Sequence, residues 1–188
     1  MKINIASNEV VHFIGIGGIG MSGLAQIMKN MGFTVQGSDS NKSKNIERLH
    51  KSGIKVCIGH NRKNLKKATL VVISSAIKKD NKELKLARIK KLPIFKRGDM
   101  LANIVSLKKN IVITGSHGKT TTTSLVANIL QEAGLDPTII NGGVINSMKN
   151  TAQLGKGDWA VIESDESDGS FLKLPVTYSV VTNIDKEH

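Results

Sequence analysis

The 188-residue chain has few cysteines and aromatic residues and no long apolar run, and each shortage excludes a class of protein. Cys57 is the single cysteine, so no disulfide can form within the chain. An aromatic content of 3% supplies few rings for stacking on nucleic-acid bases. No apolar run approaches the roughly 20 residues that span a bilayer, and the first ten residues lack the apolar segment of a signal peptide. We therefore expect a soluble, cytoplasmic protein without membrane insertion.

Positive charge is in excess, with 27 Lys+Arg against 15 Asp+Glu and a net charge of +12. Residues 1–107 carry 20 basic and 6 acidic side chains, whereas residues 108–188 carry 7 and 9. The excess is mostly lysine, spread along segments such as 81–91 that we expect to be exposed helix faces. A lysine-rich background composition or attraction of a polyanionic small substrate explains this charge, and we expect no nucleic-acid partner.

The first half of the chain alternates apolar segments with segments of helical periodicity. We expect strands at residues 10–18 (ending in a glycine turn), 33–39, 54–59, 69–77 and 92–97, and helices at 21–32, 41–53 and 81–91. The continuous apolar run from Thr69 is typical of a parallel strand that is covered on both faces. Residues 1–107 therefore predict an α/β domain with a doubly wound, Rossmann-like parallel sheet.

A second α/β unit is expected over residues 108–188. Its predicted strands are 111–114, 136–142, 158–164 and 178–184, and its predicted helix is 121–134. This unit has about 80 residues, where about 100–200 are usual for a domain. We therefore expect the start of an ATP-binding domain of the P-loop type, and a chain that is the N-terminal part of a longer protein.

The segment from Gly15 to Gly20 has the pattern G-x-G-x-x-G between a predicted strand and a predicted helix. Such glycines allow a tight turn and a close approach of the backbone to a diphosphate, which lies at the helix N-terminus. Ser22 could add a hydroxyl donor, and Asp39 ends the next strand, where NAD enzymes place a ribose-binding acid. Two plainer interpretations remain: the glycines serve helix–strand packing, and Asp39 caps the helix that starts near Ser43.

A second phosphate-binding loop is predicted at residues 112–123, VITGSHGKTTTT. It differs from the common pattern G-x-x-x-x-G-K-[ST] because Ile113 stands where the first glycine is usual. The backbone N–H groups of residues 115–119 can still form an anion nest. Lys119 can reach the β- and γ-phosphates of a nucleotide, and the Thr120 hydroxyl can bind Mg²⁺.

Acidic side chains follow the predicted strand 158–164. Glu163, Asp165, Glu166 and Asp168 stand where parallel sheets bind ligands, although an exposed acidic cluster is the plainer interpretation. His188 follows the next predicted strand in the corresponding place, and a lone histidine is more often structural than a ligand.

Together these motifs resemble the Mur ligase family of peptidoglycan synthesis. The family's shortened loop G-[TS]-x-G-K-T-T is present as GSHGKTT at 115–121. The resemblance also rests on HFIGIGGIGMSGLA at 12–25, GSD at 37–39, SSAI at 74–77, FKRGDMLA at 95–102, ESDESDGSF at 163–171 and TNIDKEH at 182–188. Glu187 stands where the family has aspartate.

The resemblance implies an ATP-dependent ligase that joins L-alanine to the lactyl carboxylate of UDP-N-acetylmuramate through an acyl phosphate. It implies Mg²⁺ as cofactor, and UDP-N-acetylmuramate, ATP and L-alanine as partners, and it leaves the oligomeric state open. The implied UDP-sugar-binding residues are Gly15, Gly17, Gly18, Gly20, Met21, Ser22, Asp39 and Ser75. The implied ATP-binding residues are Gly115, Ser116, His117, Gly118, Lys119, Thr120 and Thr121, with Lys119 catalytic. The implied metal ligands are Thr120, Glu166 and His188.

Three alternatives were weighed against this interpretation. A family member that attaches murein tripeptide to UDP-N-acetylmuramate shares most of the motifs, although its N-terminal turn usually lacks the form GIGGIGMSG. An NAD-dependent oxidoreductase leaves the second loop without a purpose, and a regulatory or partitioning ATPase leaves the first domain without one. In this family the amino-acid site lies beyond the matched motifs, so we expect the 188-residue chain alone to be inactive.

Overall fold

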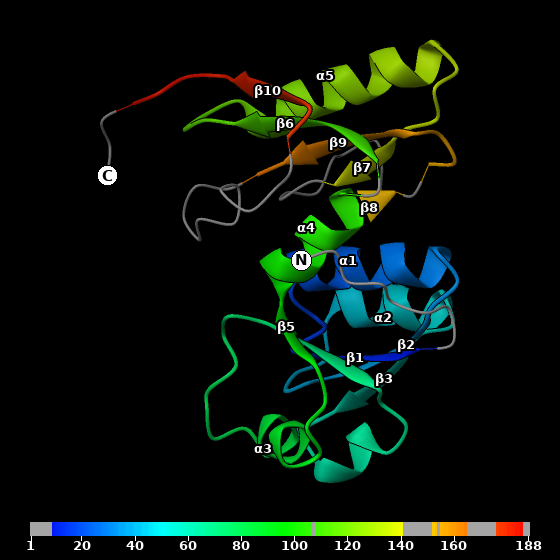
Figure 1. Ribbon diagram of the computed structural model, residues 1–188, viewed down its shortest axis with the longest axis vertical. Helices are drawn as coiled ribbons and strands as arrows, with labels where there is room; N and C mark the ends of the chain where they lie inside the picture. The colour runs from blue at the N-terminus through cyan, green and yellow to red at the C-terminus, as the bar shows by residue number, and fades with distance from the viewer. Residues whose placement is uncertain (1–8, 107, 141–151, 154, 165–175, 186–188) are drawn as a thin grey trace. The chain divides into compact units, whose positions relative to one another are not determined.

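A computed structural model of the chain describes residues 9–106, 108–140, 152–153, 155–164 and 176–185 (Figure 1). The chain forms two compact units, residues 1–100 and 101–188. The sequence analysis placed this division between residues 107 and 108. No helix in the described part of the chain is both long and apolar enough to cross a membrane.

The first unit contains a five-stranded parallel sheet. The sheet order is β3-β2-β1-β4-β5, and the strands are β1 (Val10–Ile14), β2 (Thr34–Asp39), β3 (Lys55–Ile58), β4 (Leu70–Ile73) and β5 (Ile94–Lys96). The chain builds outward from β1 through β2 to β3, and then returns to β4 on the other side of β1. This reversal separates the two connections that leave β1 and β4, and creates a crevice at the carboxyl ends of these strands.

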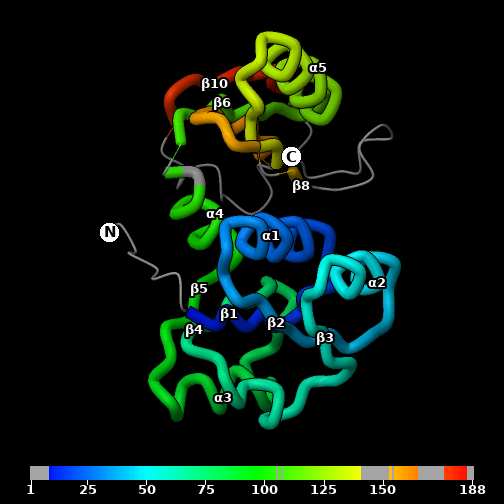
Figure 2. The backbone as a smooth tube through the Cα atoms, turned by 90° about the vertical axis from the view of Figure 1, so that its right-hand side faces the viewer, coloured from blue at the N-terminus to red at the C-terminus, as the bar shows by residue number. Residues whose placement is uncertain are grey.

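Helices cover both faces of this sheet. Helices α1 (Ile19–Asn30) and α2 (Lys44–Lys51) lie side by side on one face, and α3 (Lys82–Ile89) lies on the other (Figures 1 and 2). A short 3₁₀ helix, η1 (Arg62–Leu65), follows β3. On the α3 side the core consists of Ile14, Leu65, Val71, Leu84 and Ala87. The predicted doubly wound parallel sheet is therefore confirmed for this unit.

The sequence analysis did not predict helix α4 (Arg97–Val105). The strand expected at 92–97 is shorter in the structure, and α4 starts immediately after β5 without a connecting loop. No loop residues separate the strand pattern from the helix pattern, and a glycine, Gly98, stands in the first turn, where it weakens the helical signal. The strand expected at 69–77 is likewise shorter, because the chain leaves the sheet after Ile73.

The second unit contains a sheet of order β10-β6-β9-β7-β8. Its elements are β6 (Lys109–Thr114), α5 (Lys119–Glu132), β7 (Thr138–Ile140), β8 (Ala152–Gln153), β9 (Trp159–Glu163) and β10 (Tyr178–Val181). Strands β10, β6, β9 and β7 are parallel, and β8, which was not predicted, pairs antiparallel with β7. Ile113, Ala127, Ile139 and Val161 form the core between α5 and the sheet.

Candidate functional site

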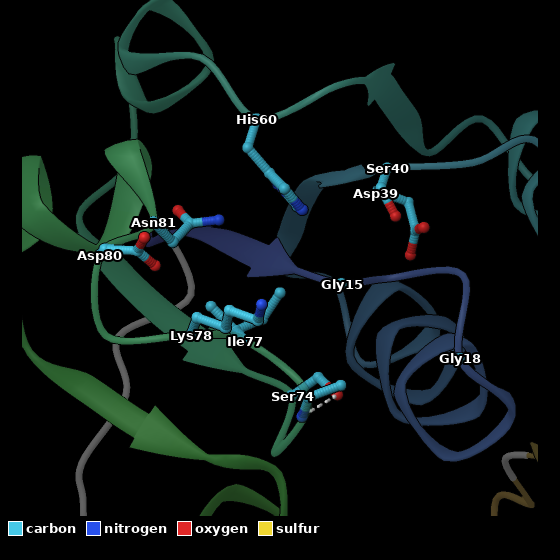
Figure 3. A pocket seen from close by; sticks show the side chains of 11 residues that line it. Gly15, Gly18, Asp39, Ser40, His60, Ser74, Ile77, Lys78, Asp80 and Asn81 are labelled. Atoms are coloured by element: carbon cyan, nitrogen blue, oxygen red, sulfur yellow. Dashed lines mark hydrogen bonds between the residues drawn. The ribbon is translucent and has the colours of Figure 1, made fainter.

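A pocket of about 510 Å³ lies at the carboxyl ends of the strands of the first unit (Figure 3). This volume falls in the range of pockets that hold small ligands. The residues that line it come from the glycine turn after β1, the end of β2, the segment after β3 and the segment between β4 and α3. They are Gly15, Gly18, Asp39, Ser40, His60, Ser74, Ala76, Ile77, Lys78, Asp80 and Asn81.

The pocket brings together some of the residues predicted to bind the UDP-sugar. Its lining includes Gly15, Gly18 and Asp39, but not Gly17, Gly20, Met21, Ser22 or Ser75. Met21 and Ser22 are buried on α1, and the Ser22 hydroxyl donates a hydrogen bond of 2.9 Å to the carbonyl of Ile19. Ser75 is exposed and lies between two lining residues. A role for these residues in UDP-sugar binding stays a prediction.

The glycine turn is held by Asp39. The backbone N–H of Gly17 donates to the Asp39 carboxylate (2.8 Å), and the Asn45 side-chain amide donates to the Gly17 carbonyl (2.9 Å). A Cβ at position 17 would lie 2.9 Å from the Asp39 carboxylate, so a larger residue displaces the turn. Gly15 has a φ of +81°, which favours glycine. Asp39 therefore does not cap α2, because the Ser43 side chain does so by accepting from the N–H of Ile46.

Five of the helix N-termini fall into two groups. Side chains of Ser43, Asn61 and Asn81 cap α2, η1 and α3 by accepting backbone hydrogen bonds. In contrast, α1 and α5 begin after Gly18 and Gly118, and no side chain caps them. These are the two helices that follow the predicted phosphate turns. An uncapped N-terminus with its positive dipole end is suited to an anion.

The second predicted site lies in the loop between β6 and α5. Gly115 and Gly118 have φ values of +132° and +80°, in the region that favours glycine. The Lys119 ammonium donates to the carbonyls of Gly115 (2.5 Å) and Ser116 (3.3 Å), so it lies over its own loop. A positive charge is thereby placed beside the N-terminus of α5.

Thr120 and Glu163 bring together two side-chain oxygens beside this loop that could bind a metal ion. The Thr120 hydroxyl donates to the Glu163 carboxylate at 3.0 Å, which joins the first turn of α5 to the end of β9. A hydroxyl and a carboxylate are ligands that Mg²⁺ accepts, so this pair fits the predicted metal. Glu166 and His188, the other predicted metal ligands, lie outside the described residues. Within the described residues no three His, Cys, Asp or Glu side chains form a metal-binding group.

The segment after β10 supports the loop from the other side. The Asn183 side-chain oxygen accepts from the N–H of His117 (2.9 Å), and the Thr182 hydroxyl donates to the His117 carbonyl (2.6 Å). The backbone N–H of Asp185 donates to the Ser116 hydroxyl (3.2 Å). One of the five N–H groups expected in the anion nest is thus bonded to Asn183. Thr121 is exposed in the first turn of α5 and takes part in none of these three hydrogen bonds.

Comparison with known proteins now decides the family. The family model described as "Mur ligase family, catalytic domain" matches residues 10–109, and "Mur ligase middle domain" matches residues 113–188. The chain belongs to the Mur ligase family. The predicted fold class, mixed α/β with parallel sheets, agrees with the solved Mur ligases that the chain resembles.

Curated relatives carry the name UDP-N-acetylmuramate--L-alanine ligase. The protein from Pelagibacter ubique is 68% identical over 188 residues, which are 100% of this chain and 40% of that protein. The protein from Azorhizobium caulinodans is 56% identical over 178 residues, which are 95% of this chain and 38% of that protein. The chain thus spans about 40% of the length of these relatives.

Two solved Mur ligases superpose on most of the chain. UDP-N-acetylmuramate-alanine ligase from Thermotoga maritima gives a TM-score of 0.87 at 34% identity, and covers 95% of this chain and 42% of its own. The ligase for UDP-N-acetylmuramate and L-alanyl-gamma-D-glutamyl-meso-diaminopimelate from Neisseria meningitides gives a TM-score of 0.86 at 30% identity. It covers 96% of this chain and 62% of its own.

Sequence reasoning missed several residues of both sites in this Mur ligase. His60, Ser74 and Asn81 line the pocket, and Thr182 and Asn183 support the loop. Only His60 directly follows a predicted strand. Ser74, Thr182 and Asn183 fall inside predicted strands that end earlier in the structure, so a correct strand boundary would have been the signal. The carboxyl ends of parallel strands meet at one edge of a sheet, so polar residues directly after strands gather there.

Proposed function

We propose that this chain forms the UDP-sugar-binding and ATP-binding parts of a ligase that joins L-alanine to UDP-N-acetylmuramate. The observation that carries the proposal is the presence of two phosphate-type turns with different chemistry. The first is a glycine backbone shaped by the Asp39 carboxylate, with the Arg97 guanidinium against Gly20, whereas the second has Lys119 within the loop and the Thr120–Glu163 pair. The name of the relative at 68% identity supports the same assignment.

In the first unit, the UDP diphosphate binds at the turn from Gly15 to Gly20, and the rest of the nucleotide occupies the pocket. The uncapped N-terminus of α1 supplies the positive end of a helix dipole. The turn itself contains no lysine or arginine, and the Arg97 guanidinium against Gly20 can add positive charge beside the diphosphate. The turn has no counterpart of the Thr120–Glu163 pair, which suits a phosphate group that the reaction does not consume.

In the second unit, ATP binds with its phosphates over the loop from Gly115 to Gly118. Lys119 neutralises charge on the β- and γ-phosphates, and this contribution grows as the γ-phosphoryl group departs. Thr120 and Glu163 would hold Mg²⁺, to which Glu166 and His188 are proposed to add ligands. When bound, the metal neutralises further phosphate charge. The support from Thr182 and Asn183 keeps the loop in one conformation before ATP arrives.

The proposed reaction has two steps. A lactyl carboxylate oxygen attacks the γ-phosphorus of ATP, the bond to the bridging oxygen breaks, and an acyl phosphate and ADP result. The amine of L-alanine then attacks the acyl carbon, loses a proton, and expels phosphate to leave an amide. Lys119 acts on the first step, because that is where the phosphoryl group moves.

The murein tripeptide ligase remains the second candidate, because the Neisseria enzyme superposes almost as well as the alanine ligase. The higher identity to named alanine ligases favours L-alanine. Turnover by a protein of the relatives' full length with each amino-acid substrate separates the two activities.

Calorimetric titration of the 188-residue chain with UDP-N-acetylmuramate tests the first site. We expect Gly17→Val to lose binding, because its side chain meets the Asp39 carboxylate and Ile46 and displaces the turn. Lys119→Ala is the matched control and should retain the affinity. Unchanged affinity in a folded Gly17→Val protein would remove the UDP-sugar from this turn, and binding of NADH in its place would favour the oxidoreductase.

A further inference from the structure

A buried carboxylate lies next to the pocket of the first unit. Glu83 is 0% exposed, and its two oxygens accept four hydrogen bonds. The donors are His12 Nε2 (3.2 Å), the Ser38 hydroxyl (2.5 Å), the Asn61 backbone N–H (3.0 Å) and the Asn64 side-chain amide (2.5 Å). An ionised carboxylate has about four acceptor sites, so Glu83 has its full set of partners.

Glu83 is in its ionised form in this network. Burial alone would raise the pKa of its carboxyl group, but hydrogen bonds from His12, Ser38 and Asn64 lower the pKa below its ordinary value. Glu83 also stands in the first turn of α3, where the helix dipole favours an anion. The carboxylate therefore accepts every hydrogen bond in the cluster and donates none.

The hydrogen positions around His12 follow from its neighbours. The Gln36 side-chain amide has two hydrogens, and it lies 3.3 Å from His12 Nδ1 and 2.9 Å from the Asn64 carbonyl. Each hydrogen thus has one acceptor, which makes His12 Nδ1 an acceptor. Nε2 of the same ring is left to donate to Glu83, in agreement with the ionised carboxylate.

The hydrogen position on His60 follows in the same way from its contact with Ser38. A serine hydroxyl has one hydrogen, and that of Ser38 is donated to Glu83. The Ser38 oxygen is 3.0 Å from His60 Nδ1, so there it can only accept. His60 Nδ1 therefore carries a hydrogen, and in the neutral ring Nε2 has a lone pair. Figure 3 shows the His60 side chain extending from its loop into the pocket.

We propose that Glu83, acting through Ser38, is a positioning residue that holds His60 in one tautomer so that its Nε2 accepts a hydrogen bond from the bound ligand. The ligand group opposite Nε2 then carries a hydrogen-bond donor. The identity of that ligand as a UDP-sugar rests on the proposed function, whereas the tautomer does not. A histidine free to choose its tautomer presents a donor to the pocket part of the time, and loses affinity for such a group.

Nitrogen-15 NMR of the histidine rings tests the tautomer directly in the 188-residue chain. At about pH 8, above the ordinary histidine pKa of about 6.5, we expect wild-type His60 to show a protonated Nδ1 and an unprotonated Nε2. Ser38→Ala removes the acceptor and leaves the buried charge in place. The Glu83 carboxylate is 3.6 Å from His60 Nδ1, beyond hydrogen-bond distance, so we expect the His60 signals to shift toward the Nε2–H form. Ser52→Ala, at the C-cap of α2, removes a hydroxyl that donates to the Arg48 carbonyl, and should leave them unchanged.

Glu83→Gln is the second variant, and it keeps the test valid if Ser38→Ala disturbs the fold. An amide at position 83 offers a donor where Ser38 now gives its hydrogen, so the Ser38 hydroxyl can turn toward His60. The expected result is the same shift of the His60 tautomer. Wild-type His60 in the Nε2–H form, or an unshifted Nδ1–H form in both folded variants, would overturn the proposal.

Titration with UDP-N-acetylmuramate, and with UDP alone, separates this inference from the proposed function. We expect about tenfold weaker binding of both ligands to Ser38→Ala and no change for Ser52→Ala. If wild type binds neither ligand while the NMR result holds, the proposed function fails and the positioning role stands. If both ligands bind equally to wild type and Ser38→Ala, His60 Nε2 does not contact them and the proposal is overturned.

Discussion

The two glycine turns of this Mur ligase share a backbone design and differ in their side chains. Both follow a central parallel strand, contain glycines with positive φ, and lead into a helix that no side chain caps. The first is shaped by a carboxylate, Asp39, whereas the second has an ammonium, Lys119, and a hydroxyl–carboxylate pair. We propose that the backbone makes a receptor for phosphate, and that the side chains decide whether the phosphate is held or transferred.

The two turns also differ in what holds them. The first is fixed by residues from β2 and α2, the next elements along the chain. The second is fixed by Thr182 and Asn183, which follow β10 and are more than 60 residues away in sequence. Its geometry therefore depends on the pairing of β10 with β6, while that of the first depends on the pairing of β2 with β1. The contacts that hold the second turn thus span a longer stretch of the chain than the 22 and 28 residues spanned by those of the first.

The largest expected effect separates the two turns by function. Lys119→Ala, in a protein of the relatives' full length that contains this sequence, should lower kcat by about 10²-fold or more, because the lost charge stabilises the departing phosphoryl group. The Kd for UDP-N-acetylmuramate should stay within about twofold. Phosphate release in the presence of L-alanine measures the first quantity, and calorimetry the second. Near-normal turnover would show that the loop does not act in the chemistry.

The next prediction concerns Glu83, the carboxylate buried beside the pocket of the first unit. Glu83→Gln should destabilise the first unit by about 3 kcal/mol, because donors that now meet a carboxylate lose an acceptor. The folded-state pKa of Glu83 is lowered, so its contribution is present above the ordinary value of about 4.3 and disappears as pH falls through the folded-state value. The stability difference between wild type and variant should therefore shrink below about pH 4.

Backbone amide exchange resolves this effect, because it reports on residues of the first unit. Fluorescence is unsuited, since the single tryptophan and tyrosine, Trp159 and Tyr178, belong to the second unit. Glu47→Gln, exposed in the first turn of α2, is the control and should give a difference of less than about 1 kcal/mol, because only the helix dipole favours this carboxylate. A Glu83→Gln difference that stays constant down to pH 3 would mean that the carboxylate does not titrate with folding.

The proposed metal-binding pair, Thr120 and Glu163, should give an effect of intermediate size. Glu163→Gln keeps an acceptor for the Thr120 hydroxyl but removes the charge that Mg²⁺ prefers. We expect about tenfold weaker binding of Mg·ATP to the full-length protein, and a higher Mg²⁺ requirement for turnover. Glu132→Gln, exposed at the end of α5, is the matched control. An unchanged Mg²⁺ dependence would place the metal on other residues.

The sequence predicted the sheets well and the contacts between distant segments poorly. Apolar periodicity and glycine turns located the strands and helices on either side of Gly15 and Gly118, because these signals are local. The sequence could not predict the hydrogen bonds between the loop and Thr182 and Asn183, because these depend on β10 pairing with β6. The buried Glu83 was expected on an exposed helix face, since its neighbours are lysines and its partners lie on other elements.

Boundaries failed for a different physical reason. The strand expected at 69–77 ends at Ile73 because the chain turns away to line the pocket, although Ala76 and Ile77 continue the apolar pattern. An apolar residue can contact a ligand as well as a core, and the pattern does not distinguish the two. Helix α4 was missed because it continues from β5 without a loop.

The smallest predicted effect concerns the two kinds of helix start. Ser43 caps α2 with a hydrogen bond of 3.4 Å from the Ile46 N–H, and α2 is among the helices that do not directly follow a predicted phosphate turn. Ser43→Ala should therefore lower the stability of the first unit by about 1 kcal/mol and leave the Kd for UDP-N-acetylmuramate unchanged. Ser52→Ala at the other end of α2 should cost less, because its hydroxyl only donates to the Arg48 carbonyl. Amide exchange of α2 measures both. A weaker affinity in Ser43→Ala would mean that loss of the cap displaces Asn45 and, through its hydrogen bond, the glycine turn at Gly17. The start of α2 and the start of α1 would then not be independent.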